Sequence, residues 1–321
     1  ADDIYQGYLF GEAVDIDGDT AVIGATGGAK GAVYVFVLLN SIWAQQAKLV
    51  DIATDSSAQF GKSVAISGNT MVVGAPTDDA PETDSGSAFV FTRTDDVWGK
   101  VAQLAPSGRI HTLSNNRFGK SVAIDSERIY VGAPGDSSTN GTDSGAVYVF
   151  TLSDGSWVEE AKLHASDGGE GDNFGHSISV FNDTLVVGAP ADDSNGTDSG
   201  ATYVFVRNAT GEWNEEVKLI ASDGAYDDNF GWSVAVGADV AIVGALYANA
   251  NGSDSGSLYT YNRTGTNWSE SSILTGTGTT SNDRLGTSVS ISGNVAVTGA
   301  PGYTEKAKEI GSIHVFTAQL R

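Results

Sequence analysis

The chain repeats one sequence pattern six times, and this repetition constrains its fold more than any other feature. A Phe-Gly pair, or Leu-Gly in the sixth copy, opens the copies at Phe10, Phe60, Phe118, Phe174, Phe230 and Leu285. A Gly-Ala pair always follows 14 residues later, and a further glycine then stands five residues before an aromatic residue. Repeats of this length are typical of chains in which one supersecondary unit is stacked or arranged around an axis.

Each copy contains short segments rich in the residues that β-strands prefer. In the second copy these segments are SVAIS, TMVVGA, GSAFVF and WGKVAQL, and Asn, Asp and Gly form the turns between them. Four-stranded antiparallel units at this period predict a β-propeller, whereas a solenoid of stacked units fits the turn spacing poorly. We therefore predict an all-β fold in a single domain spanning residues 1–321, with six blades at about 10–50, 60–105, 118–164, 174–220, 230–275 and 285–321.

The sixth copy differs from the others in its last segment. Five copies continue to a tryptophan that opens the fourth strand, at Trp43, Trp98, Trp157, Trp213 and Trp268. The sixth copy ends before this position, so we expect its blade to have three strands. Either this blade is short by nature or the chain is part of something longer.

The FG…GAP units resemble the FG-GAP repeat family, whose best-known members form the β-propeller head of integrin alpha subunits. The stretches ASDG before FG and NGTDSG after GAP are similar to the bacterial type of this repeat. The resemblance covers essentially the whole chain. Integrin heads have seven blades, so part of a seven-bladed ring is the alternative to six. The resemblance implies an extracellular or cell-surface module for binding or adhesion.

Composition narrows the range of partners. The chain has 40 acidic against 17 basic residues and a net charge of −23, which repels nucleic acid and anionic lipid surfaces. No apolar run approaches the roughly 18 residues of a membrane helix, so membrane insertion is not expected. Cysteine is absent, which excludes disulfides and thiolate chemistry. A protein or a glycan is the expected ligand.

The repeated glycines and aromatic residues have a structural interpretation. Glycine permits close backbone approach where the inner strands of several blades crowd together. The phenylalanine of each FG pair is expected to pack between neighbouring blades, and the five tryptophans are expected to be buried on the outer strands. These positions therefore predict the core and not the ligand site.

Acidic loops are predicted to gather on one face of the blades. In an antiparallel blade, the loop before strand 1 and the loop between strands 2 and 3 lie at the same end. Clustered carboxylates in short Gly-containing loops are ligands that Ca²⁺ prefers, although Asp-Ser-Gly is also ordinary turn chemistry. The candidate Ca²⁺ ligands are Asp78, Asp79, Asp84, Asp136, Asp143, Asp167, Asp172, Asp192, Asp193, Asp198, Asp223, Asp228 and Asp254.

The calcium loop of integrin-like repeats does not carry over to these positions. That loop has the pattern DxDxDG, and the chain has a partial match in the expected hairpin only at Asp15, Asp17 and Asp19. A solvated turn is the favoured interpretation there. Ca²⁺ therefore stays a candidate cofactor on the evidence of loop composition alone.

The residue after each FG pair varies while its surroundings stay constant. It is Glu12, Lys62, Lys120, His176, Trp232 and Thr287 in successive copies. A variable position on a constant frame, at the start of the innermost strand, indicates a recognition surface. The first five are candidate ligand-binding residues, and neutral drift at a tolerant position is the alternative.

Catalysis is the less favoured class of function. The chain has no GxSxG elbow, HExxH helix or phosphate loop. A polysaccharide lyase or hydrolase could use His176, Tyr226 and nearby acids, but no spacing specifies such a site. We therefore expect a non-catalytic binding or adhesion module, with a polysaccharide-active enzyme and a structural spacer within a larger surface protein as alternatives.

Overall fold

The computed structural model describes residues 7–27, 30–51, 57–79, 82–107, 114–137, 141–305 and 308–317. Its contacts divide the chain into two compact units, Ala1–Leu163 and His164–Arg321. Each unit contains three blades, and every blade is a separate antiparallel sheet whose strands follow chain order. No helix among the described residues is long and apolar enough to span a membrane.

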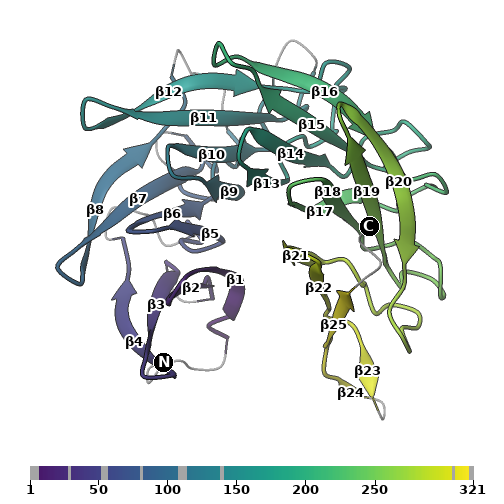
Figure 1. Ribbon diagram of the computed structural model, residues 1–321, viewed down its shortest axis with the longest axis horizontal. Helices are drawn as coiled ribbons and strands as arrows, with labels where there is room; N and C mark the ends of the chain where they lie inside the picture. The colour runs from purple at the N-terminus through teal and green to yellow at the C-terminus, as the bar shows by residue number, and fades with distance from the viewer. Residues whose placement is uncertain are drawn as a thin grey trace. The chain divides into compact units, whose positions relative to one another are not determined.

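The first unit holds blades 1 to 3, with four strands each (Figure 1). Blade 1 consists of β1 (Phe10–Asp17), β2 (Thr20–Ala25), β3 (Ala32–Leu39) and β4 (Ile42–Leu49). Blade 2 consists of β5 (Ser63–Ser67), β6 (Thr70–Ala75), β7 (Ser87–Thr94) and β8 (Val97–Leu104). Blade 3 consists of β9 (Ser121–Ile124), β10 (Arg128–Ala133), β11 (Ala146–Ser153) and β12 (Ser156–Leu163).

The second unit holds blades 4 to 6. Blade 4 consists of β13 (Ser177–Phe181), β14 (Thr184–Ala189), β15 (Ala201–Arg207) and β16 (Trp213–Leu219). Blade 5 consists of β17 (Phe230–Val236), β18 (Val240–Ala245), β19 (Ser257–Thr264) and β20 (Asn267–Leu274). Blade 6 consists of β21 (Ser288–Ser292), β22 (Val295–Ala300) and β25 (Ser312–Thr317), with the hairpin β23 (Thr304–Glu305) and β24 (Lys308–Glu309) inserted before β25.

Neighbouring blades of a unit meet through their first strands. β5 contacts both β1 and β9 in the first unit, and β17 contacts both β13 and β21 in the second. The fourth strands lie at the opposite edges of the sheets (Figure 1). The predicted all-β fold of six propeller blades, with three strands in the last, is therefore confirmed.

The seam between two blades is built from main-chain atoms at the repeated glycines. A methyl group on Gly188 would lie 1.9 Å from the carbonyl oxygen of Gly231, the FG glycine of the next blade. Gly231 itself has φ of +94°, a left-handed conformation that favours glycine. The same clash would arise at Gly24, Gly74 and Gly244. The sequence repeats glycine here because two backbones pass too close for any side chain.

A serine at the start of the first strand adds a bond across three of the seams. Ser233 Oγ donates to the carbonyl oxygen of Gly286 at 2.7 Å, and Ser63 and Ser177 make the equivalent bond to Gly119 and Gly231. Ser288 of blade 6 is exposed.

We expect Ser233→Ala to lower the free energy of unfolding by about 1 kcal/mol, the net worth of one hydrogen bond. Ser288→Ala is the matched control and should change it by less than about 0.5 kcal/mol. Urea unfolding followed by circular dichroism measures both. Equal effects of the two substitutions would contradict the role of the seam bond.

The FG aromatic residues form the core between blades, as predicted. Phe174 is fully buried and packs edge-on against Tyr203 and Phe205 of its own blade, with ring centroids 5.5 and 5.8 Å apart. Phe60, Phe118, Phe230 and Leu285 are equally buried. Phe10 of blade 1 differs, with 37% of its surface exposed.

The outer strands match the expectation only in part. Trp98 is buried, and Trp157, Trp213 and Trp268 are half-buried. Trp43 is 42% exposed, so the prediction that all five tryptophans belong to the core was wrong for blade 1. Among the described residues no strand pairs with the outer edge of β25, where Ile313 is 75% exposed.

Candidate functional site

Two kinds of loop meet at one end of the blades. We call the loop before strand 1 the lead-in loop and the loop between strands 2 and 3 the DSG loop. Hydrogen bonds join the DSG loop of one blade to the lead-in loop of the next. Between blades 4 and 5 they run from the amides of Asp227, Asn229 and Phe230 to the carbonyls of Thr197, Asp198 and Ser199, at 3.0, 3.1 and 3.0 Å.

The same three bonds recur between blades 2 and 3 and between blades 5 and 6. They join Asn115, Arg117 and Phe118 to Thr83, Asp84 and Ser85, and Asn282, Arg284 and Leu285 to Ser253, Asp254 and Ser255. Within each unit, both kinds of loop therefore lie on one face, as the sequence predicted. Main-chain hydrogen bonds therefore hold the backbone of this face across these seams.

The aspartates of the DSG triplets shape the turn. Asp84, Asp143, Asp198 and Asp254 all have φ between 50° and 54°, a left-handed conformation that aspartate tolerates. The amide of Asp198 donates to Asp193 Oδ1 at 2.9 Å, and the amide of Asp84 donates to Asp79 Oδ1 at the same distance. Asn249 and Ser137 accept the equivalent bonds in blades 5 and 3. Each of these side chains closes its own loop.

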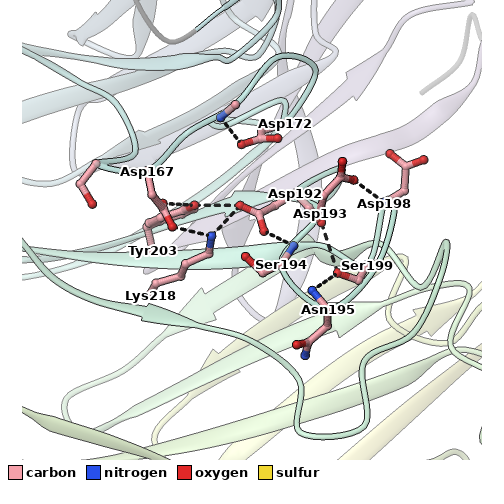
Figure 2. A network of polar contacts seen from close by, with 12 residues as sticks. Asp167, Asp172, Asp192, Asp193, Ser194, Asn195, Asp198, Ser199, Tyr203 and Lys218 are labelled. Carbon is pink, nitrogen blue, oxygen red and sulfur yellow. Dashed lines mark hydrogen bonds and ion pairs between the residues drawn. The ribbon is translucent and has the colours of Figure 1, made fainter.

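Asp192 is the centre of a polar network in blade 4 (Figure 2). Its side chain is almost fully buried, and Oδ2 accepts hydrogen bonds from the Tyr203 hydroxyl at 2.9 Å and from Lys218 Nζ at 2.8 Å. Asp167, from the lead-in loop, contacts the same two groups at 2.8 and 2.9 Å. Strands β15 and β16 place Tyr203 directly opposite Lys218, so register creates this cluster.

The network shifts the pKa of its members. Burial and the two carboxylates raise the pKa of the Tyr203 hydroxyl far above its ordinary value. Burial opposes ionisation of Asp167, but the hydrogen bonds from Lys218 and Tyr203 outweigh it and lower the pKa of that carboxyl. Burial also opposes the charge on Lys218, yet both aspartates raise its pKa. The network therefore contains a lysine held in its charged form between two carboxylates.

Blades 2 and 3 use the corresponding aspartate in similar ways. Asp136 is fully buried and accepts hydrogen bonds from the Tyr148 hydroxyl at 2.6 Å and Lys162 Nζ at 2.7 Å. Asp78 is nearly as buried, and its Oδ2 accepts the Ser87 hydroxyl at 2.6 Å. These aspartates thus act as hydrogen-bond acceptors within their own blades.

A second set of buried aspartates holds the lead-in loops. Asp172 Oδ2 accepts the amide of Gly169 at 2.6 Å, and Asp228 Oδ2 accepts the amide of Ala225 at 2.8 Å. Asp283 of blade 6, which the sequence analysis did not select, makes the same bond to Thr280 at 2.6 Å. Burial raises the pKa of Asp172 and Asp228.

Blade 5 lacks the central acid and the lysine. Ala248 stands where blade 4 has Asp192, and Ile273 lies opposite Tyr259 where blade 4 has Lys218. The Tyr259 hydroxyl still donates to Asp223 Oδ1 at 2.8 Å. Acid and lysine are therefore lost together, while the tyrosine and the lead-in aspartate remain.

The residues after the FG pairs form small groups within each unit. In the first, Lys62 pairs with the Glu12 carboxylate, which also accepts the Thr26 hydroxyl. The charges of Lys62 and Glu12 both influence the pKa of Lys120. In the second unit, the His176 ring lies 4.5 Å from the Trp232 ring between centroids. All five predicted recognition residues are at least partly accessible.

Lys120 is the lysine with the most altered titration in the described part of the chain. Burial and the charges of Lys62 and Arg117 lower the pKa of its ammonium to about 8, and Glu12 only partly opposes this. NMR titration of the lysine side chains should therefore show one pKa near 8, and Lys62→Met should raise it.

The same shift links Lys120 to stability. The folded-state pKa lies below the ordinary lysine value of 10.5, so protonation disfavours the folded state, and the free energy of unfolding should rise as pH increases between about 8 and 10.5. Lys120→Met should remove this rise. A pKa near 10.5 for every lysine would contradict the assignment.

The structure brings few acidic side chains together in the manner of a metal site. Among the described residues, no group of three His, Asp or Glu side chains lies close enough to hold a metal ion. Asp15 and Asp17 of the partial DxDxDG match accept the amides of Ile66 and Gly68 across the first seam, at 2.7 and 2.6 Å. Ca²⁺ binding on this face stays a prediction.

Several residues of this face were not found from the sequence. Tyr148, Tyr203 and Tyr259 contact the loop aspartates, and Lys162 and Lys218 reach them from the outer strands. The repeat did contain a signal, because an aromatic residue stands two positions before the strand-3 aromatic in every blade except the last. Among the described residues no hydrogen bond or ring contact joins His176 to Tyr226, the two residues named for the alternative enzyme, and Tyr226 is 71% exposed.

Comparison with known families gives the same organisation. The model of the FG-GAP repeat matches six segments, residues 1–36, 43–91, 98–150, 157–205, 213–261 and 268–316. From the second onward, each match begins at an outer-strand tryptophan and ends at the strand-3 aromatic of the next blade, so each sequence repeat spans a seam. These matches cover most of the chain, and the chain belongs to the FG-GAP repeat family.

Proposed function

We propose that this chain is a non-catalytic extracellular binding module that recognises a protein or a glycan through the face formed by the lead-in and DSG loops. FG-GAP repeats typically occur in extracellular or surface proteins, and their propellers mediate interactions. The observation that carries the proposal is that main-chain groups and variable side chains have different roles on this face. Main-chain bonds join its loops across the seams, and the residues after the FG pairs vary on this frame.

Preorganisation supports recognition here. The loop backbones are bonded to the next blade, and the buried Asp136 and Asp192 are paired with lysines of their own blades, so binding requires little ordering of loops. The accessible groups differ from blade to blade, with a Lys and Glu pair in the first unit and a His and Trp pair in the second. Tyrosine and tryptophan offer large contact areas at low entropic cost, which makes Trp232 a favourable contact residue.

The test is binding of the purified chain to an array of glycans and extracellular proteins. The double variant Trp232→Ala with His176→Ala should lower the affinity for any ligand of this face at least tenfold. Asn267→Ala, at the first residue of β20 and at the opposite end of blade 5, is the control and should bind as the parent does. Binding that is lost only with changes at the opposite end, or turnover of a glycan on the array, would contradict the proposal.

The Ca²⁺ part of the proposal rests on the exposed loop carboxylates. Ca²⁺ at 100 times its dissociation constant should stabilise the fold by about 2.7 kcal/mol, and Asp193→Asn should reduce this gain because it removes charge from a DSG loop. Thermal melts with Ca²⁺, with Mg²⁺ and with EDTA measure the effect. Identical melting temperatures in Ca²⁺ and EDTA would remove Ca²⁺ from the proposed function and leave recognition in place.

A further inference from the structure

A cleft opens on the loop face of blade 6. Its volume is about 510 Å³, and its walls are the lead-in loop and the segment after β22. Ligand pockets for small molecules span roughly 300–1,000 Å³. The lining residues are Ser281, Asn282, Arg284, Pro301, Gly302 and Thr304. The cleft is thus large enough for a sugar unit and is lined mainly by polar groups.

Arg284 places a positive charge in the cleft, and no carboxylate of the described residues pairs with it. Its guanidinium makes no hydrogen bond or ion pair with the described residues. Arg128 and Arg263, in contrast, are paired with Glu160 at 2.9 Å and Glu216 at 3.0 Å. In a chain with a net charge of −23, an arginine without a carboxylate partner is notable.

The position of Arg284 is set by its surroundings. Its amide donates to the carbonyl of Asp254 at 3.1 Å, and its guanidinium lies over the Tyr247 ring, 5.6 Å from the centroid. Tyr247 is peculiar to blade 5, because the corresponding positions of blades 2 to 4 are Thr77, Gly135 and Ala191. Stacking on an aromatic face leaves the edge of the guanidinium, with its N–H donors, available. Arg117, the equivalent arginine before blade 3, lies after a DSG loop without this tyrosine.

The cleft walls are fixed by the backbone. Gly302 donates to the carbonyl of Asp283 at 3.1 Å, and Asn282 donates to that of Ser253 at 2.8 Å. A methyl group on Gly302 would lie 1.9 Å from the carbonyl oxygen of Asn282, so the two walls are in contact at the base. Asp283 directs its Oδ2 at the amide of Thr280, within the lead-in loop.

We propose that this cleft binds an acidic sugar, a uronate unit of a glycan, with Arg284 holding the carboxylate. Arginine and carboxylate form bidentate, charge-assisted hydrogen bonds. Ser281, Asn282 and Thr304 offer hydroxyl and amide groups that pair with sugar hydroxyls, and Pro301 offers an apolar contact. The inference rests on the glycan branch of the proposed function and adds the class of sugar. One carboxylate in the cleft matches the single guanidinium of Arg284, and a short acidic glycan limits the repulsion from the net charge of the chain.

The experiment is titration calorimetry of the intact chain with trigalacturonate and with the neutral galactose trimer. The acidic trimer should bind at least tenfold more tightly than the neutral one, and its affinity should fall as salt is added. Arg284→Gln should lower the affinity for the acidic trimer at least tenfold and leave the affinity for the neutral trimer unchanged. Arg284→Lys should recover only part of the loss, because lysine cannot form the bidentate contact.

Matched variants separate this site from general charge effects. Arg117→Gln removes the same charge at the equivalent position of blade 3 and should leave the affinity for trigalacturonate unchanged. Tyr247→Ala should weaken binding severalfold because the guanidinium loses its support. Equal binding of the two trimers, or an effect of Arg117→Gln as large as that of Arg284→Gln, would overturn the uronate site.

The failure of this inference is distinguishable from failure of the proposed function. If the chain binds a sulfated glycan, a neutral glycan or an acidic protein on the array with no effect of Arg284→Gln, the uronate site is wrong and the binding module stands. If the chain binds nothing on the array and neither trimer, both are wrong. Binding of trigalacturonate that depends on Arg284 supports both.

Discussion

Gly188→Ala is expected to lower the free energy of unfolding by more than about 3 kcal/mol or to prevent folding. The added methyl group would lie 1.9 Å from the Gly231 carbonyl oxygen and 2.3 Å from Ser177 Oγ. Overpacking in a well-packed interior costs about 1–3 kcal/mol, and more where backbone must move. Here the obstacle is the backbone of the next blade, which is itself held by hydrogen bonds to blade 4.

Gly99→Ala is the control for this substitution. A methyl group at Gly99, on β8, meets no atom within 4 Å, and its φ is not in the left-handed range. Alanine should therefore be tolerated or stabilise slightly at this position. Urea unfolding of both variants tests the comparison, and a Gly188→Ala variant as stable as Gly99→Ala would show that the seam can relax.

Asp192→Ala is expected to destabilise the fold by about 2–3 kcal/mol. Removing one member of a buried ion pair costs about 3–5 kcal/mol because the partner charge is left uncompensated. The cost should be smaller here because Lys218 keeps Asp167 as a partner. Thermal and urea unfolding measure the loss, with Asp239→Ala in the turn between β17 and β18 as a surface control.

Blade 5 suggests how to reverse the loss. It has alanine and isoleucine where blade 4 has Asp192 and Lys218, and it keeps the tyrosine bonded to a lead-in aspartate. The double variant Asp192→Ala with Lys218→Ile should therefore recover at least half of the stability lost by Asp192→Ala alone. A double variant less stable than either single variant would show that blade 4 depends on the charges themselves.

The fold could be predicted from the sequence because the same strand and turn pattern occurs six times. The spacing from Phe174 to Gly188, and from Gly200 to Phe205, fixes strand lengths and turns, and antiparallel connection then places the loops on one face. The burial of Phe174 and its equivalents followed from the same argument. The burial of Trp43 was predicted wrongly because burial at this position depends on a neighbouring blade and not on the repeat alone.

The details of the site were less accessible. The sequence identified Asp192 and Asp167 as loop acids but could not show that strand register places Tyr203 and Lys218 between them. It did not single out Arg284, because the residue before FG changes from blade to blade and its support by Tyr247 crosses a seam. Interactions that depend on two repeats at once are not visible in the pattern of either.

Many of the contacts that join one blade to the next use peptide groups and glycines, which most copies supply in the same places. The ends of one repeat are thus compatible with the ends of another. Evolution could reorder or exchange blades, and with them the residues after FG, without redesigning the joints. Chimaeras in which the repeats at 157–205 and 213–261 trade places should consequently fold, while presenting their recognition groups in a new order.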